Sequence, residues 1–483
     1  MFEDVEDVSL DPLHKFAKGQ DLADGTSESF RNGAEVMGAF NFLRLMGGTV
    51  ASSLGDPINL VIANGFGRTM KYGMVPLLKD FGAAMKNADG DLRRLSRLAM
   101  ANAEIELNSR IGLLADIGNP YAKASPAVTF SRNASKTFSK ATGITFWNSF
   151  WKQVSFNTTQ GRIVQNAMDG WASTSKAERA WMLNLGINEN GLAKIRAAFD
   201  GQEGSKFVDG TDLPIASFDK WTDQEAGELI RSAAFAESHN AVVTPHFSDK
   251  LRMAGTPLGR LILQFRSFML ANQMRVIGRN IQLASIDDAG SKRLGVYTGL
   301  FGLAMAGAMV DATKHMLGNT TITGSSLDGD HSSFDRVVRE WENAPGNALY
   351  NALDRSSMFG IVFEGSNMLD KLGLPNIRGG ISNVLGDDPG VGRKGASRFA
   401  NRGVFESAFG PSAGMIEDFA KVGSFVTGFG DAYLGSNEGA TFNRSDFCRV
   451  RRLLPGQNAP ILQQMLNEGE AQMGTIFDWP NPQ

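Results

Sequence analysis

Cysteine is almost absent from this sequence: Cys448 is the single thiol among 483 residues. One cysteine excludes a disulfide framework and any metal site that is built from several thiolates. Histidine is also scarce, and the 5 His residues are scattered along the chain. Because a metal centre gathers several such ligands in a small space, we expect this protein to hold no metal and no cofactor.

An excess of charge of one sign is lacking as well. The chain has 48 Lys and Arg residues against 51 Asp and Glu residues, a net charge of −3. Bulk charge therefore does not demand a nucleic acid or a membrane as partner. Glycine, by contrast, is abundant: it supplies 55 of the 483 residues, above the usual share of about 7%. The glycines are accompanied by 32 Phe and 20 Met but only 5 Tyr.

Apolar residues recur with the period of a helix. Trp147, Phe150, Trp151 and Val154 follow the i, i+3, i+4, i+7 spacing of one helix face. Strand-like alternation is not sustained, although short stretches such as 126–130 could pair as minor strands. We therefore predict an all-α fold, an extended multi-helix assembly with long glycine-rich loops and no extensive sheet.

Several helix starts are marked by their capping residues. Residues 175–178 and 222–225 have the Ser/Thr-x-x-Glu pattern of a capping box. Pro257 suits the first turn of a helix, and we expect one long helix to follow it. The apolar stripe of that helix would consist of Leu258, Leu261, Ile262, Phe265, Met269, Val276 and Leu283.

Composition divides the chain into four regions. Residues 1–30 have a net charge of −6 (2 minus 8), which is typical of a flexible acidic arm that is solvated or docks on a basic partner. An N-terminal helical region follows over 31–205. Residues 206–325 form a central helical region with a basic amphipathic helix and an apolar Gly/Ala-rich helix, and residues 326–483 form a Gly-rich helical region.

Motifs for catalysis are weak. The GxGxxG match at 390–395 follows a turn rather than a buried strand, so it does not predict a dinucleotide site. Cys448 lies among arginines that could lower its pKa, but no catalytic partner follows it. We expect a protein that is not an enzyme. The alternative is a peptidoglycan-active enzyme that uses one carboxylate, such as Glu406 or Glu417.

The segment 249–293 is basic, with a net charge of +5 (8 minus 3). Its arginines alternate with the apolar stripe, which predicts an amphipathic basic helix. Three interpretations of this basic face stay open. It is a solvated helix face, it contacts anionic lipid at a membrane surface, or it contacts a phosphate backbone. The candidate DNA- or lipid-facing residues are Arg252, Arg260, Arg266, Arg275, Arg279, Lys292 and Arg293.

An uncharged run, residues 295–310, follows directly. It is shorter than the about 20 apolar residues of a spanning helix. Small residues four apart let helices approach closely, which favours a buried helix in an assembly; a conditional membrane-inserting segment is the alternative.

Each glycine inside a helix costs about 1 kcal/mol of helix stability relative to Ala, so we expect a chain that adopts more than one packing. The candidate packing residues are Gly295, Gly299, Gly302, Ala306 and Gly307.

Several short segments together resemble one protein family. GRLILQFRSF precedes the apolar run, NALDRSSMFG follows it, and RRLLPGQN comes near the end of the chain. This order is similar to the C-terminal part of the large internal core proteins, or DNA-ejection proteins, of short-tailed bacteriophages. The segments that carry the resemblance are 43–48, 52–57, 63–65, 259–268, 351–360 and 451–458.

The resemblance implies a structural internal virion protein that is ejected from the capsid core into the host envelope, where it helps to form a conduit for phage DNA. The implied partners are further copies in a homo-oligomeric ring, other internal virion or ejection proteins, portal or tail proteins, phage DNA, and the host inner membrane or periplasm. Many members carry a lytic transglycosylase domain, but we find no similar context for a catalytic glutamate here. A membrane-active pore protein unrelated to virions is a further alternative.

Overall fold

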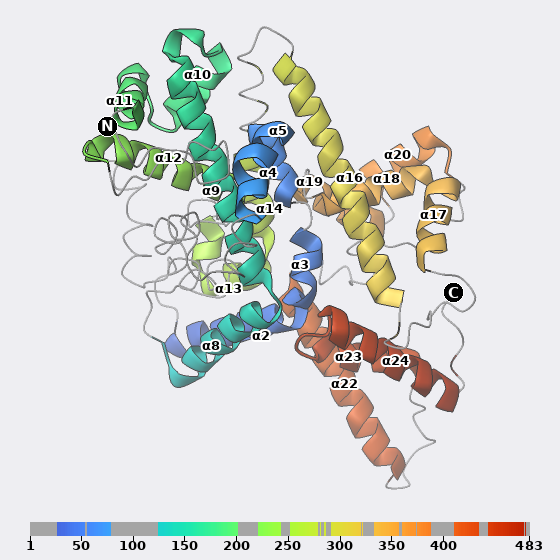
Figure 1. Cartoon of the computed structure of the whole chain (residues 1–483). Helices are drawn as coiled ribbons and strands as arrows, with labels where there is room; N and C mark the ends of the chain where they lie inside the picture. Colours follow the sequence, from blue (N-terminus) through green and yellow to red (C-terminus); the bar gives the residue numbers. More distant parts are fainter. Residues whose placement is uncertain are drawn as a thin grey trace, which may run out of the picture.

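The computed structural model describes eleven main stretches and four single residues of the chain. These are residues 27–53, 56–78, 124–200, 221–242, 252–278, 291–319, 333–356, 360–372, 374–387, 410–433 and 443–477, with 281, 285, 321 and 479. Every regular element among them is a helix (Figure 1), which confirms the all-α fold class. Residues 1–26 of the predicted arm and the predicted boundaries near 205 and 325 lie outside the described residues.

Helix α2 (Glu28–Leu45) and helix α8 (Pro126–Ala141) pack side by side at the lower left of Figure 1. The Ser27 hydroxyl caps α2 by accepting the Phe30 N–H at 3.2 Å, so the helix begins inside the predicted arm. Residues 126–130, considered above for a minor strand, open α8 instead. The physical reason is a Ser125 cap followed by proline at the first helical position.

Five short elements follow α2. These are η1 (Met46–Gly48), α3 (Thr49–Ser52), α4 (Asp56–Asn64), α5 (Phe66–Arg68) and the π-helix η3 (Thr69–Met74).

Helix α9 (Ile144–Asp169) is the central element, and most of the other N-terminal helices contact it. Trp151 and Val154 are buried in a cluster with Leu60 of α4, and Trp147 and Phe150 pack against that cluster. The spacing of these four residues therefore predicted a real packing face.

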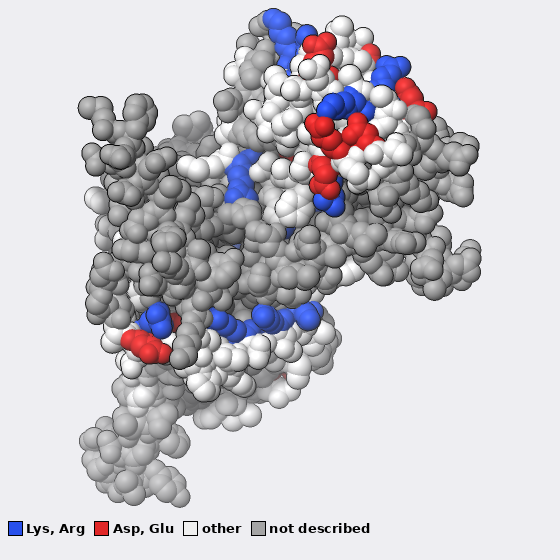
Figure 2. All heavy atoms as spheres, turned by 90° about the vertical axis from the view of Figure 1, so that its left-hand side faces the viewer, with Lys and Arg blue, Asp and Glu red and all other residues white. Residues whose placement is uncertain are grey.

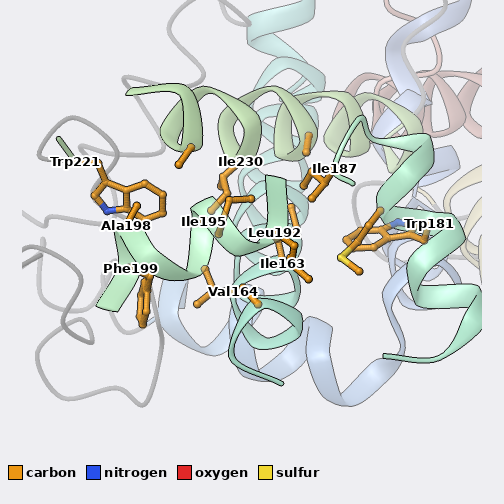
Figure 3. Packing of buried hydrophobic residues seen from close by; sticks show 14 residues of the cluster. Ile163, Val164, Trp181, Ile187, Leu192, Ile195, Ala198, Phe199, Trp221 and Ile230 are labelled. Carbon is orange, nitrogen blue, oxygen red and sulfur yellow. The ribbon is translucent and has the colours of Figure 1, made fainter. Parts of the chain in front are cut away.

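The largest hydrophobic core surrounds the second half of α9 (Figure 3). Trp181, Ile195 and Trp221 are each no more than 1% exposed there. Ser175 caps α10 as predicted, because its hydroxyl accepts the Glu178 N–H at 3.2 Å. The helix predicted at 222–225 is capped by Asp223 rather than by the threonine before it. The helices that supply this core with α9 are η4 (Trp171–Ser173), α10 (Lys176–Asn184), α11 (Glu189–Asp200) and α12 (Gln224–Ala241).

The predicted long helix after Pro257 is broken. Phe265 has φ 69°, a left-handed conformation that is costly for a residue with a side chain and that separates α13 from α14. The expected apolar stripe is disrupted as well, since Leu258 is 57% exposed. The segments are η8 (Arg252–Gly255), α13 (Pro257–Ile262), α14 (Arg266–Asn272) and the π-helix η9 (Gln273–Gly278).

The remaining helices form two groups (Figure 1). The long helix α16 (Ser291–Asn319) lies beside the first group on the right, and the second group lies at the bottom. The first group is α17 (Ser333–Asn343), α18 (Pro345–Arg355), α19 (Gly360–Lys371) and α20 (Ile377–Leu385); the second is α22 (Pro411–Tyr433), α23 (Arg444–Leu453) and α24 (Pro460–Ile476).

A buried ion pair links α9 to α10. Arg162 binds both carboxylate oxygens of Glu178, each at 3.0 Å, and Arg68 reaches the same carboxylate at 2.8 Å. The third Arg162 nitrogen, Nη1, donates to Asn64 Oδ1 at 3.0 Å. Burial acts to raise the pKa of Glu178, but the charges and hydrogen bonds of Arg162 and Arg68 outweigh it, and this pKa lies far below its ordinary value.

We expect Glu178→Gln to destabilise the fold by about 3–5 kcal/mol at pH 7, because Arg162 loses its bidentate carboxylate. A lowered pKa stabilises the folded state above the ordinary value of 4.5, and this contribution disappears as the pH falls below it. Urea unfolding from pH 7 to pH 3 should therefore show a shallower loss of stability in the variant.

The matched control is Glu225→Gln, which removes an exposed carboxylate that pairs with Lys194. Its cost should stay within about 0.5 kcal/mol at pH 7. Equal costs for the two variants would contradict the special role of the buried pair.

Candidate functional site

The candidate basic residues of 252–293 do not form one solvated face. Arg260 is only 8% exposed, and burial lowers its pKa to about 10. Arg266 is half-buried and binds Glu364 of α19, with Nη2 at 2.9 Å from Oε1. The expectation that Arg260 and Arg266 line a solvated DNA- or lipid-facing helix is therefore corrected: Arg260 is buried, and Arg266 is held by Glu364.

The other candidates of this set are only partly placed. Arg275 is half-buried in η9, and Arg279 lies outside the described residues. For Arg252, Lys292 and Arg293 the structure describes the backbone, in η8 and α16, and not the side-chain environment.

The small residues of α16 lie where it meets neighbouring helices. Ala306 is 2% exposed, and a Cβ atom at Gly307 would collide with the carbonyl oxygen of Ala352 in α18. A Cβ atom at Gly302 would lie 3.4 Å from the Ile58 side chain of α4. Gly307 therefore sets the distance between α16 and α18.

Two candidates, Gly295 and Gly299, belong to the first turns of α16, and their surroundings are not described. Within the described part of the chain, no helix combines the length and the apolar character that a bilayer crossing requires.

An ion pair completes the contact between α16 and α18. Arg355 Nε lies 2.9 Å from Asp311 Oδ1, and both side chains are 10% exposed. The opposite side of α16 carries exposed apolar side chains, namely Phe301, Met305, Met309 and Met316.

A polar junction joins α2, the end of α13, α22 and α23, which lie far apart in the sequence. Arg44 of α2 is 2% exposed, and its guanidinium donates to Pro411 O at 3.1 Å and to Asn41 Oδ1 at 3.3 Å. Asp418 of α22 lies 3.6 Å from Arg44 Nη1 and 2.9 Å from Arg452 Nη2. We call this the α2 junction; its members are Asn41, Arg44, Gln264, Ser412, Asp418 and Arg452.

Buried amides hold the second half of the α2 junction. Asn41 donates to Gln264 Oε1 at 3.2 Å and to Ser412 Oγ at 2.8 Å. Gln264, in turn, donates to the carbonyl oxygen of Gly38 at 2.8 Å. A buried amide without partners costs about 1–3 kcal/mol, so these bonds fix three segments against one another.

The Asp418 carboxylate of the α2 junction is buried between two arginines. Burial raises the pKa of the Asp418 carboxyl, and the nearby Arg452 and Arg44 offset only part of that rise. Removing charged groups from water costs more than a single ion pair returns unless the geometry is very good. The junction therefore adds little to the free energy of unfolding. Its main effect is to specify which segments of the chain pack together.

Backbone contacts bring two of the resemblance segments together beside the α2 junction. A Cβ atom at Gly47 would collide with the backbone nitrogen of Ala459. The Gly456 N–H donates to Leu43 O at 2.8 Å. Segment 43–48 therefore packs directly on segment 451–458, and Gln264 of segment 259–268 is held by the same helix α2.

The carboxylate and thiol considered for catalysis lack the expected properties. Glu417 is exposed and paired with Lys421, and that hydrogen bond lowers its pKa rather than preparing it as an acid. Burial raises the pKa of the Cys448 thiol despite the arginines around it. Glu406 and the glycine motif at 390–395 lie outside the described residues, and the described residues contain no cluster of three metal-ligating side chains.

No protein-family model, no curated protein and no solved structure matches this chain. What bears on its function is the geometry of the α2 junction and of the contact between α16 and α18, together with the residues that carry the resemblance.

The polar partners of Arg44 were not identified from the sequence. Asn41 and Arg44 are three residues apart, the spacing that places two side chains on one helix face. That spacing indicates a polar face, but it gives no sign that Ser412 and Asp418 cover it.

Gly307→Ala should destabilise the protein by about 1–3 kcal/mol, because the added methyl group forces α16 and α18 apart. The matched control is Gly365→Ala in α19, where a Cβ atom meets nothing within 4 Å. That change should stabilise the protein by up to about 1 kcal/mol through helix propensity. Thermal unfolding of both variants checks the pair, and a stabilising Gly307→Ala would refute close packing at this position.

Proposed function

We propose that this protein is a non-enzymatic structural component of a bacteriophage virion, an internal core protein that leaves the capsid with the DNA. In this proposal it assembles as a homo-oligomeric ring with other internal virion, portal or tail proteins. After ejection it lies in the host envelope, at the inner membrane or in the periplasm, and helps to conduct DNA.

The convergence of the resemblance segments is the observation that carries this proposal. Segments 43–48, 259–268 and 451–458 were singled out by sequence alone, yet they meet at and beside the α2 junction. Residues of 351–360 meet α16 through Gly307 and Asp311. Chance likenesses scattered over the chain have no reason to gather in this way, so their contacts support the resemblance.

The break at Phe265 supports the further expectation that the chain adopts more than one packing. The sequence favours one helix through this segment, but the left-handed Phe265 interrupts it. Backbone strain of this kind persists only where the surroundings hold it. Here Gln264 and Arg266, on either side, bind Gly38 and Glu364. Releasing those contacts would allow α13 and α14 to join into a single helix.

The uneven core supports the same proposal. The hydrophobic cluster around Trp181 is large, whereas the cluster at α2 contains only Ala39 and Phe42 as fully buried members. Polar contacts exchange with water at little net cost. A chain joined in this way can separate its helices without exposing a large apolar surface, which suits passage through a narrow tail.

The proposal is tested by mass spectrometry of purified particles of a phage whose genome encodes this chain. We expect the protein inside particles in a fixed copy number compatible with a ring, since repeated subunits around an axis form heterologous contacts. Its absence from particles would refute the proposal. Zymography on cell-wall material is the companion measurement: we expect no clearing, and a cleared band would favour the peptidoglycan-active alternative instead.

A further inference from the structure

The outer face of α8 carries positive charge without any acidic residue. Arg132, Lys136 and Lys140 are the ionisable residues of this helix, which gives it a charge of +3. Arg132 binds Glu35 of α2 at 2.5 Å. Lys136 and Lys140 form no ion pair with any described residue, and Lys140 is exposed. Two uncompensated cations therefore remain on this face.

These cations lie in register along the helix. Positions four apart are separated by about 6 Å along a helix axis, so the three basic residues span about 12 Å. Asn133 and Thr137, which are exposed on the same side, add an amide and a hydroxyl group. Cations with interleaved neutral donors are the side chains that bind phosphate oxygens.

The inner face of α8 is neutral and fixed. Ser131, Ser135 and Ser139 are buried there, and each hydroxyl donates to a carbonyl oxygen within α8 at 2.9 Å. The serines therefore seat the helix on α2 without contributing charge, and the basic side chains are held on the outward side.

This arrangement differs from the other charged surface of the N-terminal half. On α11 and α12, Lys194 binds Glu225 and Arg231 binds Glu228, so the charges compensate one another. Figure 2 shows mixed blue and red side chains in the upper part of this side of the molecule. In its lower part, at the height of α2 and α8 in Figure 1, blue side chains form a row with red ones at one end only.

We propose that the outer face of α8 is a docking surface for the phosphate backbone of duplex DNA. An interfacial membrane helix must bury an apolar face, and the side of α8 that carries the cations offers none, because Asn133 and Thr137 lie between them. Single-strand binding relies on rows of stacking aromatics, and Phe130 is the only exposed aromatic residue of α8. Duplex DNA has the densest phosphate charge of these partners.

The choice of DNA rather than RNA rests on the proposed function. The binding of phosphate by Lys136 and Lys140 follows from their charge and does not depend on that function. We therefore place the DNA contact on the outer face of α8 and not on the basic segment 252–293. In that segment Arg260 is buried and Arg266 is paired with Glu364.

Binding of a fluorescent 30-base-pair duplex to the full chain, measured by anisotropy from 50 to 200 mM salt, tests the surface. Two phosphate contacts, from Lys136 and Lys140, predict a slope of about −1.8 in log K against log salt, or about 12-fold weaker binding over this range. Lys136→Gln with Lys140→Gln should weaken binding roughly tenfold or more at 50 mM salt and make the slope shallower by about 2.

Two matched variants separate position from net charge and from misfolding. Lys194→Gln with Arg231→Gln removes the same charge from α11 and α12 and should leave binding unchanged. Lys136→Arg with Lys140→Arg keeps the charge on α8 and should retain binding, and circular dichroism checks that all variants fold.

Equal losses in the two Gln variants, an unchanged affinity in the α8 variant, tighter binding to a single strand, or binding only to anionic vesicles would each overturn the proposal. The particle measurement is independent of it. If the protein is present in virions but binds no duplex, only the proposal for α8 is refuted. If it binds duplex DNA but is absent from virions, only the proposed virion function is refuted.

Discussion

The guanidinium group of Arg44 is almost completely removed from water, and a charge in that position requires partners that do not move. These partners come from three places in the chain: Asn41 on the same helix, Pro411 and Asp418 at and beyond the start of α22, and the backbone of Arg452. Because the desolvated charge cannot be left alone, the N-terminal and C-terminal segments must meet. The positions of α22 and α23 depend on this requirement.

The same principle recurs away from α2, where buried or half-buried arginines join one helix to another. Arg162 connects α9 to α10, Arg266 connects α14 to α19, and Arg355 connects α18 to α16. The cluster around Trp181 and Ile195 is different, since burial of apolar surface holds it together without directional bonds. The fold therefore combines two hydrophobic clusters around α9 with a set of helices whose arrangement is specified by charge and amide pairing.

The sequence predicted those features that depend on neighbouring residues. The all-α class, the packed face from Trp147 to Val154 and the Ser175 cap all follow from local spacing. The break at Phe265 could not be predicted, because it depends on Gln264 reaching Gly38, more than 200 positions away. For the same reason Arg260 was assigned to a solvated face: a basic residue on a helical period looks exposed until the covering segments are known.

The serines on the inner face of α8 have a consequence for the handling of this chain in solution. Apart from Val128 and the half-buried Phe138, which packs on Phe42 of α2, the buried side of the helix consists of hydroxyl groups that already bond to their own backbone. When α8 lifts from α2, Val128 and Phe138 are the apolar side chains that it newly exposes, and the serine hydroxyl groups between them are compatible with water. Its detachment is therefore expected to be reversible even at high local concentration, where an exposed leucine face would lead to aggregation.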